Sequence, residues 1–531
     1  MTIARWTPPV APTRQEQFLL KRLDRVRKLL GFLRLHRHEL FDDAFQEELA
    51  AMYRSTGAGK EAHPPAMMAM AMLVQGYLGM SDAEMVELTV VDLRVQMVLG
   101  CLGAETPPFS QGALQEFRER LMAADLDRRV LERTVALAKA TQAFDYRKLP
   151  KTLRVAIDSS PLAGAGRVED TVNLLAHAAR QVVRCAADLL GWTDEQVCRR
   201  AGIPLLVESS IKRALDIDWN DAGEKTDAIT IFTGQLDALQ AWIARQFPKE
   251  SGQPPLKAPV DALVQIRTQD LEPDPAGGVR IRAGVAPDRR VSIHDREMRH
   301  GRKSKSQRIN GFKRHIAADI DRGLILACAI TPANRPEDDA VPSLTVDMAH
   351  QGLDVDHLLI DRGYINSPLV DQVLARRGTI ICKPWTSRNG TLFPKSAFTL
   401  NIRNRTITCP NGQVQDFAFG RVVAFDPAVC DRCVRRAQCT TAARGHGRSV
   451  AIADDEALQQ RLRKRIDTAA GRAALRERTT IEHKLAHISQ RQGNHARYVG
   501  VRKNTFDLRR ASAIQNLETL HRAEIESRKA A

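Results

Sequence analysis

Apolar residues recur at helical spacing through most of the first 150 residues. From Gln15 to Leu35, large apolar residues stand three or four positions apart with basic residues between them, which predicts helix over this span. Ser81 followed by Glu84 has the form of a capping box and predicts the start of another helix. A further helix is expected from Ser110. Residues 1–150 are therefore predicted to form a helical domain.

Beyond residue 150 the helical spacing gives way to short apolar runs. Residues 153–157 are predicted to form a strand that ends on Asp158, with a loop after it. Further strands are expected over residues 312–318, 324–330 and 357–360, and a shorter one over 380–382. The end of the chain, about 455–526, is again helical in its spacing and basic. Together these elements predict an α/β fold.

Two insertions are expected within this α/β region. Residues 165–250 have helical spacing and a capping-box pattern at Thr193 and Gln196, and a linker rich in proline and glycine follows. The predicted helical insertion and linker thus occupy 165–290, and a Cys-rich insertion occupies 385–460. The core is left with the segments 151–164, 291–384 and 461–526.

Composition narrows the classes of function. The chain has 79 basic and 63 acidic residues among 531, a net charge of +16, which favours a polyanionic partner. Apolar runs of about 18 residues and a signal-peptide pattern are both missing, so a cytoplasmic protein without a membrane span is expected. Nine cysteines, five of them scattered singly, favour a reducing compartment over a disulfide framework.

Two aspartates follow predicted strands of the core. Asp158 comes after 153–157, and Asp361 comes after Leu358–Ile360. The carboxyl ends of central strands form the crevice where α/β sheets place their chemistry. Either residue alone would be read as an ordinary aspartate that ends a strand or caps a helix, and the pair favours a functional interpretation. Glu482, on a predicted helix, would alone be read as a solvated charge.

These residues resemble those of the bacterial insertion-sequence DDE transposases. The resemblance is carried by Val155–Ser160, Ile360–Tyr364, Arg478-x-x-Ile-Glu482, Asn310–His315, Thr331–Asn334, Phe117–Leu121 and Ala496–Asn504. It implies a ribonuclease-H-like mixed sheet core behind a helical N-terminal DNA-binding domain. It also implies that Asp158, Asp361 and Glu482 are catalytic and bind Mg²⁺ or Mn²⁺.

The chain departs from this family at two positions near the glutamate. Relatives often carry a tyrosine three residues before the arginine and a lysine seven residues after the glutamate, and here those positions hold Leu475 and Ser489. Arg478 is retained, and Arg491 is a candidate for the missing cation. These two differences argue against the hairpin-type cleavage chemistry of that subgroup of relatives. They do not affect the prediction of the three acids.

Phosphodiester cleavage explains why the three acids are needed. Two divalent ions about 4 Å apart activate the nucleophile and stabilise the leaving group, and Mg²⁺ prefers carboxylate ligands. The predicted function is a transposase that cuts the ends of an insertion sequence and joins a 3′ hydroxyl to target DNA. Two alternatives stay open: a domesticated, sequence-specific DNA-binding protein without catalysis, and a site-specific DNA nuclease.

The Cys-rich insertion contains a candidate structural zinc site. Cys409, Cys430, Cys433 and Cys439 have the spacing C-x20-C-x2-C-x5-C, and four thiolates of this kind are typical of tetrahedral zinc. Unligated or partly redox-active cysteines are the alternative.

Basic residues near the proposed site predict contacts with double-stranded DNA. Cations that track phosphates are expected beside a DNA-cleaving site. Sequence-specific recognition is expected from the N-terminal helices, as a helix-turn-helix around 81–121, and the protein is expected to act as a homodimer on DNA. The candidate DNA-binding residues are Arg299, Arg302, Lys303, Lys305, Lys313, Arg362, Arg478, Arg497, Arg502 and Lys503.

Overall fold

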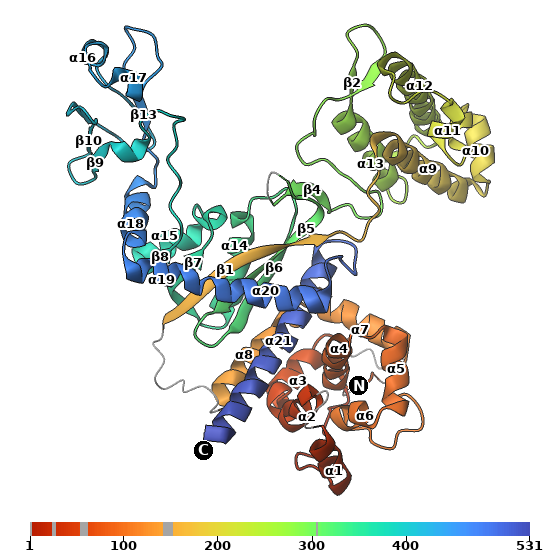
Figure 1. The fold of residues 1–531 in the computed structure, drawn as a ribbon. Helices are drawn as coiled ribbons and strands as arrows, with labels where there is room; N and C mark the ends of the chain where they lie inside the picture. Colours follow the sequence, from red (N-terminus) through yellow and green to blue (C-terminus); the bar gives the residue numbers. More distant parts are fainter. Residues whose placement is uncertain (1–2, 24–27, 54–61, 142–151, 304–305, 531) are drawn as a thin grey trace.

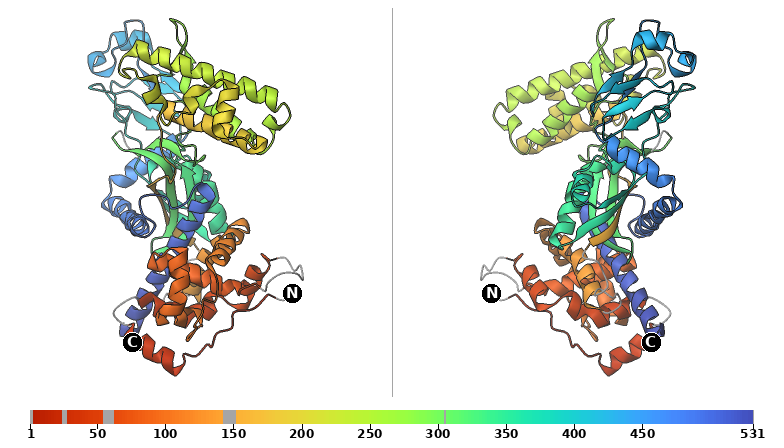
Figure 2. Two further views of the ribbon diagram at one scale, coloured as in Figure 1. Left: turned by 90° about the vertical axis from the view of Figure 1, so that its right-hand side faces the viewer. Right: turned by 90° about the vertical axis from the view of Figure 1, so that its left-hand side faces the viewer.

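A mixed β-sheet lies at the centre of the molecule, with helices of the N-terminal region at one end and two arms at the other (Figure 1). The structure is a computed structural model, and it describes residues 3–23, 28–53, 62–141, 152–303 and 306–530. Figure 2 shows the same order of layers from the side.

The N-terminal region is helical, as predicted. Its helices are α1 (Arg14–Arg22), α2 (Lys28–Leu40), α3 (Asp43–Ala50), α4 (Pro65–Leu78), α5 (Asp82–Val91), α6 (Leu93–Leu99), α7 (Gln111–Ala123) and α8 (Leu126–Ala140). The capping box of Ser81 and Glu84 is present at α5, and Ser110 caps α7. The predicted span from Gln15 to Leu35 is divided between α1 and α2, and residues 24–27 lie outside the described part.

The central sheet has the strand order β4-β5-β1-β7-β8, with β6 also paired to β5. Strand β1 pairs antiparallel with β5 and parallel with β7, which in turn pairs parallel with β8. This mixed sheet is consistent with a ribonuclease-H-like core. The strands are β1 (Thr152–Ala163), β4 (Arg299–Arg302), β5 (Arg308–Asp319), β6 (Leu324–Pro332), β7 (Asp354–Ile360) and β8 (Thr379–Ile381).

The prediction that Asp158 ends its strand is wrong. Strand β1 continues to Ala163, because its partner β5 is long enough to pair with every residue from Val155 to Ala163. Only the pairing with β7 stops, at Ile157. Pro161 lacks an N–H donor and lies where β7 no longer needs one, so it is tolerated within the strand.

Helices cover both faces of the sheet and join it to the N-terminal region. Helix α21 contacts β6, α8 and α4, so the sheet and the N-terminal helices share one apolar core. Helix α20 crosses the sheet beside β1 (Figure 1). These helices are α14 (Val341–His350), α15 (Pro368–Ala375), α18 (Glu456–Ile466), α19 (Ala469–Glu477), α20 (Thr479–Gln492) and α21 (Val501–Ala530).

The first arm is the helical insertion, which has a separate apolar core. Its capping box of Thr193 and Gln196 is present. The expected linker contains a helix and a hairpin, because apolar residues such as Leu263 and Ile266 pack into that core. The elements are α9 (Thr171–Leu190), α10 (Asp194–Ala201), α11 (Ile211–Leu215), α12 (Ala222–Gln246), α13 (Lys257–Asp270), β2 (Leu271–Pro273) and β3 (Val279–Ile281).

The second arm is the Cys-rich module, which we define as residues 393–452. Its small core is built around Phe398, Ile407 and Phe425. The module joins the sheet through the segments that follow β8 and precede α18. Its elements are β9 (Thr399–Asn401), β10 (Thr406–Thr408), β11 (Val414–Asp416), β12 (Val422–Ala424), β13 (Ser449–Ala451), α16 (Pro427–Asp431) and α17 (Arg436–Cys439). Among the described residues, no helix combines the length and apolar character needed to cross a membrane.

Candidate active site

Asp158 and Asp361 lie beside each other on neighbouring parallel strands. The last paired residues of β1 and β7 are Ile157 and Ile360, and each aspartate is the next residue of its strand or of the turn that follows. Asp158 is half-buried and Asp361 is exposed. The register of two strands therefore brings together carboxylates that are 203 positions apart in the sequence.

Arg478 connects Asp158 to Glu482. Its guanidinium donates to Asp158 Oδ2 at 2.8 Å and to Glu482 Oε1 at 3.0 Å. Arg478 stands at the start of α20 and Glu482 lies one turn later, so the helix presents both side chains on the same face. One cation thus holds two of the three predicted acids close together.

Burial raises the pKa of the Asp158 carboxyl above its usual value. The backbone N–H of Ser159, which donates to Asp158 Oδ1 at 2.8 Å, and the charge of Arg478 act in the opposite direction. The negative charges of Asp361 and Glu337 raise the pKa further. Asp158 therefore lies in a cluster of carboxylates that favours a cation.

Glu337 is a fourth carboxylate at this site, and sequence reasoning missed it. The Ser159 hydroxyl donates to Glu337 Oε1 at 2.7 Å. Gly363 makes room for it, since a Cβ atom there would stand 2.2 Å from Glu337 Oε2. A signal was available in the sequence: Glu337 closely follows a predicted strand, as Asp361 does.

A buried hydrogen-bonded network fixes the turn after Asp361. His315 Nδ1 lies 2.8 Å from Tyr364 Oη, and His315 Nε2 lies 2.9 Å from Thr331 Oγ1. Burial lowers the pKa of His315 to about 3, so the imidazole is neutral at physiological pH. The turn of Asp361 and Tyr364 is thereby tied to the middle of β5 and, through His315, to the end of β6.

The far end of α20 is also attached to β1. The buried guanidinium of Arg314 donates to Ser160 Oγ at 3.0 Å, to Ser489 Oγ at 2.8 Å and to the Gly493 carbonyl at 2.9 Å. Ala163 exchanges backbone hydrogen bonds with residues 494 and 496, at 2.9 and 2.7 Å. Ser489, which stands where relatives often carry lysine, is therefore part of this attachment.

The predicted DNA-binding residues differ in how free their side chains are. Arg302, Lys303, Arg497 and Lys503 are exposed, whereas Lys305 lies outside the described residues. Three others have internal partners: Arg299 pairs with Asp288, Arg502 pairs with Asp127, and Lys313 donates to the Arg335 carbonyl. Arg362 lies over the Trp385 ring, and Arg491, the candidate substitute cation, pairs with Glu518.

No three histidine, cysteine or acidic side chains of the described residues are arranged to hold a metal ion. The donor set of Asp158, Asp361 and Glu482 nevertheless fits Mg²⁺ or Mn²⁺ chemically, because it consists of carboxylate oxygens. Arg478 supplies the positive charge between two of them. The site thus fits a divalent metal in donor chemistry, while a guanidinium stands between two of the ligands.

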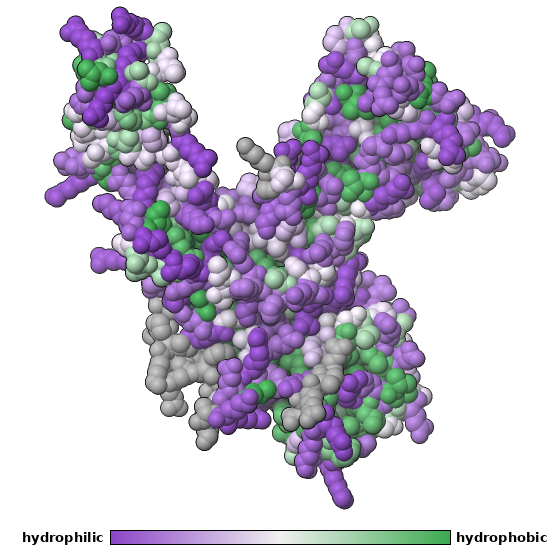
Figure 3. Space-filling view, viewed as in Figure 1, coloured by the Kyte–Doolittle hydropathy of each residue, from purple (hydrophilic) through white to green (hydrophobic). Residues whose placement is uncertain are grey.

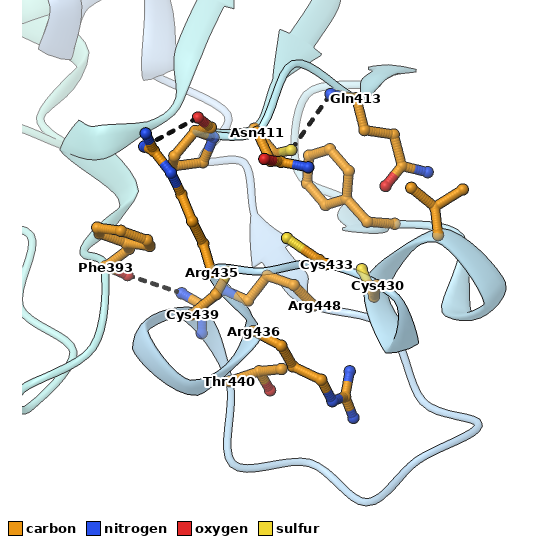
Figure 4. A pocket seen from close by; sticks show the side chains of 14 residues that line it. Phe393, Asn411, Gln413, Cys430, Cys433, Arg435, Arg436, Cys439, Thr440 and Arg448 are labelled. Carbon is orange, nitrogen blue, oxygen red and sulfur yellow. Dashed lines mark hydrogen bonds between the residues drawn. The ribbon is translucent and has the colours of Figure 1, made fainter.

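Four thiols gather in the Cys-rich module. Cys409, Cys430, Cys433 and Cys439 line one pocket, together with Phe393 (Figure 4). Burial raises the pKa of Cys439, and the other three thiols lie near enough to raise it further. Residues that are 30 positions apart therefore meet in one place, and no disulfide joins them.

Comparison with known proteins gave two family matches. The family described as "Transposase DDE domain" matches residues 408–521, and the family described as "Transposase domain (DUF772)" matches residues 21–120. The first match contains Arg478 and Glu482 but neither aspartate. No curated protein and no solved structure matched the chain. The two transposase matches, at opposite ends of one α/β chain, support its assignment to the insertion-sequence DDE transposases.

Proposed function

We propose that the protein cleaves the ends of an insertion sequence and joins the 3′ hydroxyl to target DNA in a metal-dependent reaction. The observation that supports this proposal is that Arg478 bridges Asp158 and Glu482, while strand register sets Asp361 beside Asp158 at the carboxyl ends of β1 and β7. The transposase matches already imply DNA as the substrate.

Asp158, Asp361 and Glu482 would hold the divalent ions. When bound, such ions act as Lewis acids toward the scissile phosphate and activate the attacking oxygen. Arg478 offsets the charge of Asp158 and Glu482 in the structure, and with metal bound its guanidinium would be available to the scissile phosphate. The His315–Tyr364 pair holds the Asp361 turn in place during this exchange.

Several exposed cations would bind the DNA backbone next to these acids. Arg302 ends strand β4 and Lys303 follows it, whereas Arg497 lies between α20 and α21 and Lys503 lies in the first turn of α21. Phosphate contacts fix the position of a duplex without reading its sequence. Recognition of the element ends is assigned to α5–α7, and the pairing of two ends to a homodimer.

Single-turnover nicking of a duplex that carries one element end, with Mg²⁺, tests the proposal. The wild-type protein is expected to nick and to join, and Asp361→Asn is expected to bind DNA without cutting. Asp371→Asn, an exposed acid on the following helix, is the matched control and should cut normally. Binding of the element end without cleavage by the wild type under any divalent metal would favour the non-catalytic alternative. Cleavage without joining would favour the nuclease.

A further inference from the structure

The Cys-rich module carries an excess of positive charge that the proposed active site does not use. Its 60 residues contain eight arginines and one lysine against three aspartates, a net charge of +6. The helical insertion and linker, residues 165–290, contain 16 basic and 18 acidic residues. The two arms thus differ sharply in charge, so the basic character of the whole chain does not explain that of the module.

Most of these arginines are exposed and outside ion pairs; Arg435 donates to the Pro410 carbonyl, and Arg405 lies over the Phe419 ring. Lys395 pairs with Glu456, and Arg436 pairs with Asp431. The whole of residues 393–452 is described, and six exposed arginines there form no ion pair: Arg403, Arg405, Arg421, Arg432, Arg435 and Arg444. Unpaired exposed arginines are suited to phosphate, because the planar guanidinium binds it bidentately.

The large aromatic side chains of the module are used for its core. Residues 393–452 contain five phenylalanines and neither tyrosine nor tryptophan, and each phenylalanine is buried or half-buried. Single-stranded nucleic acid is usually held by bases stacked on exposed aromatic rings. The module therefore offers charge without stacking surfaces, which fits the backbone of a duplex.

The position of the module places this charge beside the cleavage site in the chain. It is joined to β8 on one side and, through α18 and α19, to Arg478 and Glu482 on the other. Figure 3 shows the module as a separate arm with hydrophilic and hydrophobic residues on the face in view, and with open space between it and the helical insertion.

We propose that the Cys-rich module is a second, phosphate-directed contact for double-stranded DNA. This inference rests on the proposed function. Arg432 and Arg435 lie on either side of Cys433, in the segment that contributes Cys430, Cys433 and Cys439 to the thiol pocket. The contact adds affinity without sequence preference, because phosphates are the same in every sequence.

The test measures binding of the full chain, in an Asp361→Asn background, to a fluorescent random-sequence duplex over a range of salt concentrations. Glutamine replaces all six exposed arginines in one variant. A matched control replaces six exposed cations of the helical insertion by glutamine: Arg199, Arg200, Arg213, Arg245, Lys249 and Arg282. A third variant carries lysine at the six module positions, and thermal unfolding confirms that each variant is folded.

The slope of log Kd against log salt should become shallower by about 0.9 for each DNA phosphate that the six-glutamine variant no longer neutralises. The helical-insertion control and the lysine variant should keep the wild-type slope. Equal changes of slope in the module variant and the insertion control would overturn the inference, since only net charge would matter. A parent that binds no DNA would instead remove the proposed function. Preferential weakening of RNA binding would replace the duplex by another nucleic acid.

Discussion

The Ser159 hydroxyl donates a hydrogen bond to the Glu337 carboxylate at 2.7 Å, across 178 positions of sequence. Ser159 is the neighbour of Asp158, so this bond places a fourth negative charge beside the proposed metal ligands. Glu337 raises the pKa of Asp158 through that charge. It therefore influences the proton that must leave Asp158 before metal can bind.

Glu337→Gln should move the acid limb of the pH–rate profile to lower pH. The amide keeps an oxygen that accepts from Ser159 but loses the charge that raises the pKa of Asp158, so Asp158 ionises at lower pH. Single-turnover nicking measured against pH reports this shift. Asp339→Asn, an exposed acid two positions away, is the control. An unmoved limb in the glutamine variant would mean that Glu337 acts only as a structural acceptor.

Arg478→Gln should shift the same limb in the opposite direction and slow cleavage. Loss of the guanidinium removes a charge that lowers the pKa of Asp158, so ionisation requires higher pH. It also releases Glu482, and misplacement of a reacting group costs on the order of 100-fold in rate. Arg478→Lys should recover only part of the rate, because one ammonium replaces a fork that spans two carboxylates. Arg476→Gln, at an exposed position of α19, should cut at the wild-type rate.

Asp158→Asn should abolish cleavage and raise thermal stability at pH 8 in the absence of metal. The folded protein holds the Asp158 proton more tightly than the unfolded chain, so stability from this group is lost as pH rises through the raised pKa. Asparagine cannot ionise, so the variant does not lose this stability at high pH. Its melting midpoint should exceed that of the wild type by about 2 °C or more. The difference should shrink as the pH falls below the raised pKa of Asp158, because the wild-type carboxyl is then protonated as well. A variant that is less stable at pH 8 would show that the bond to Arg478 outweighs burial.

Cys409, Cys430, Cys433 and Cys439 line one pocket but are not arranged as a metal site in the structure, and we expect them to take up one zinc ion per chain. Serine at Cys430 or Cys433 should remove the metal and expose the module to limited proteolysis, because structural zinc contributes folding energy. Cys185→Ser, at a half-buried thiol of the helical insertion, should keep the full zinc content. Metal analysis of protein purified under reducing conditions gives the result. A wild-type chain free of zinc would leave the four thiols as unligated cysteines.

Local pattern was sufficient for most secondary structure. The apolar runs at 312–318, 324–330 and 357–360 are strands, and both predicted capping boxes form, since these features depend on neighbouring residues. The end of β1 was predicted incorrectly because it depends on the length of a partner strand some 150 residues away. The position of Glu337 after a predicted strand was a local signal, but its hydrogen bond to Ser159 depends on a strand that is 178 positions away in the sequence.

In the candidate site, too, features that depend on neighbouring residues were predicted, and features that depend on distant residues were not. Asp158, Asp361 and Glu482 were chosen from their sequence contexts. The structure sets Asp361 beside Asp158 through strand register and joins Asp158 to Glu482 through Arg478, and their catalytic role stays a prediction. The internal pairing of Arg299 with Asp288 and of Arg502 with Asp127 could not be anticipated. A run of basic residues does not reveal which of its members find an acidic partner after folding.

The attachment of α20 to β1 at both ends has a consequence for how such a chain can change. Asp158 holds the start of the helix through Arg478, and Ala163 holds the segment after its end. The position of Glu482 is thus set by two attachment points on strand β1. It does not depend on the number of residues that separate the acids in the sequence. Both arms leave and rejoin the chain outside these points. Either arm can therefore be shortened or replaced by another insertion without altering the distances between the acids. The core can accept different inserted domains at these two positions.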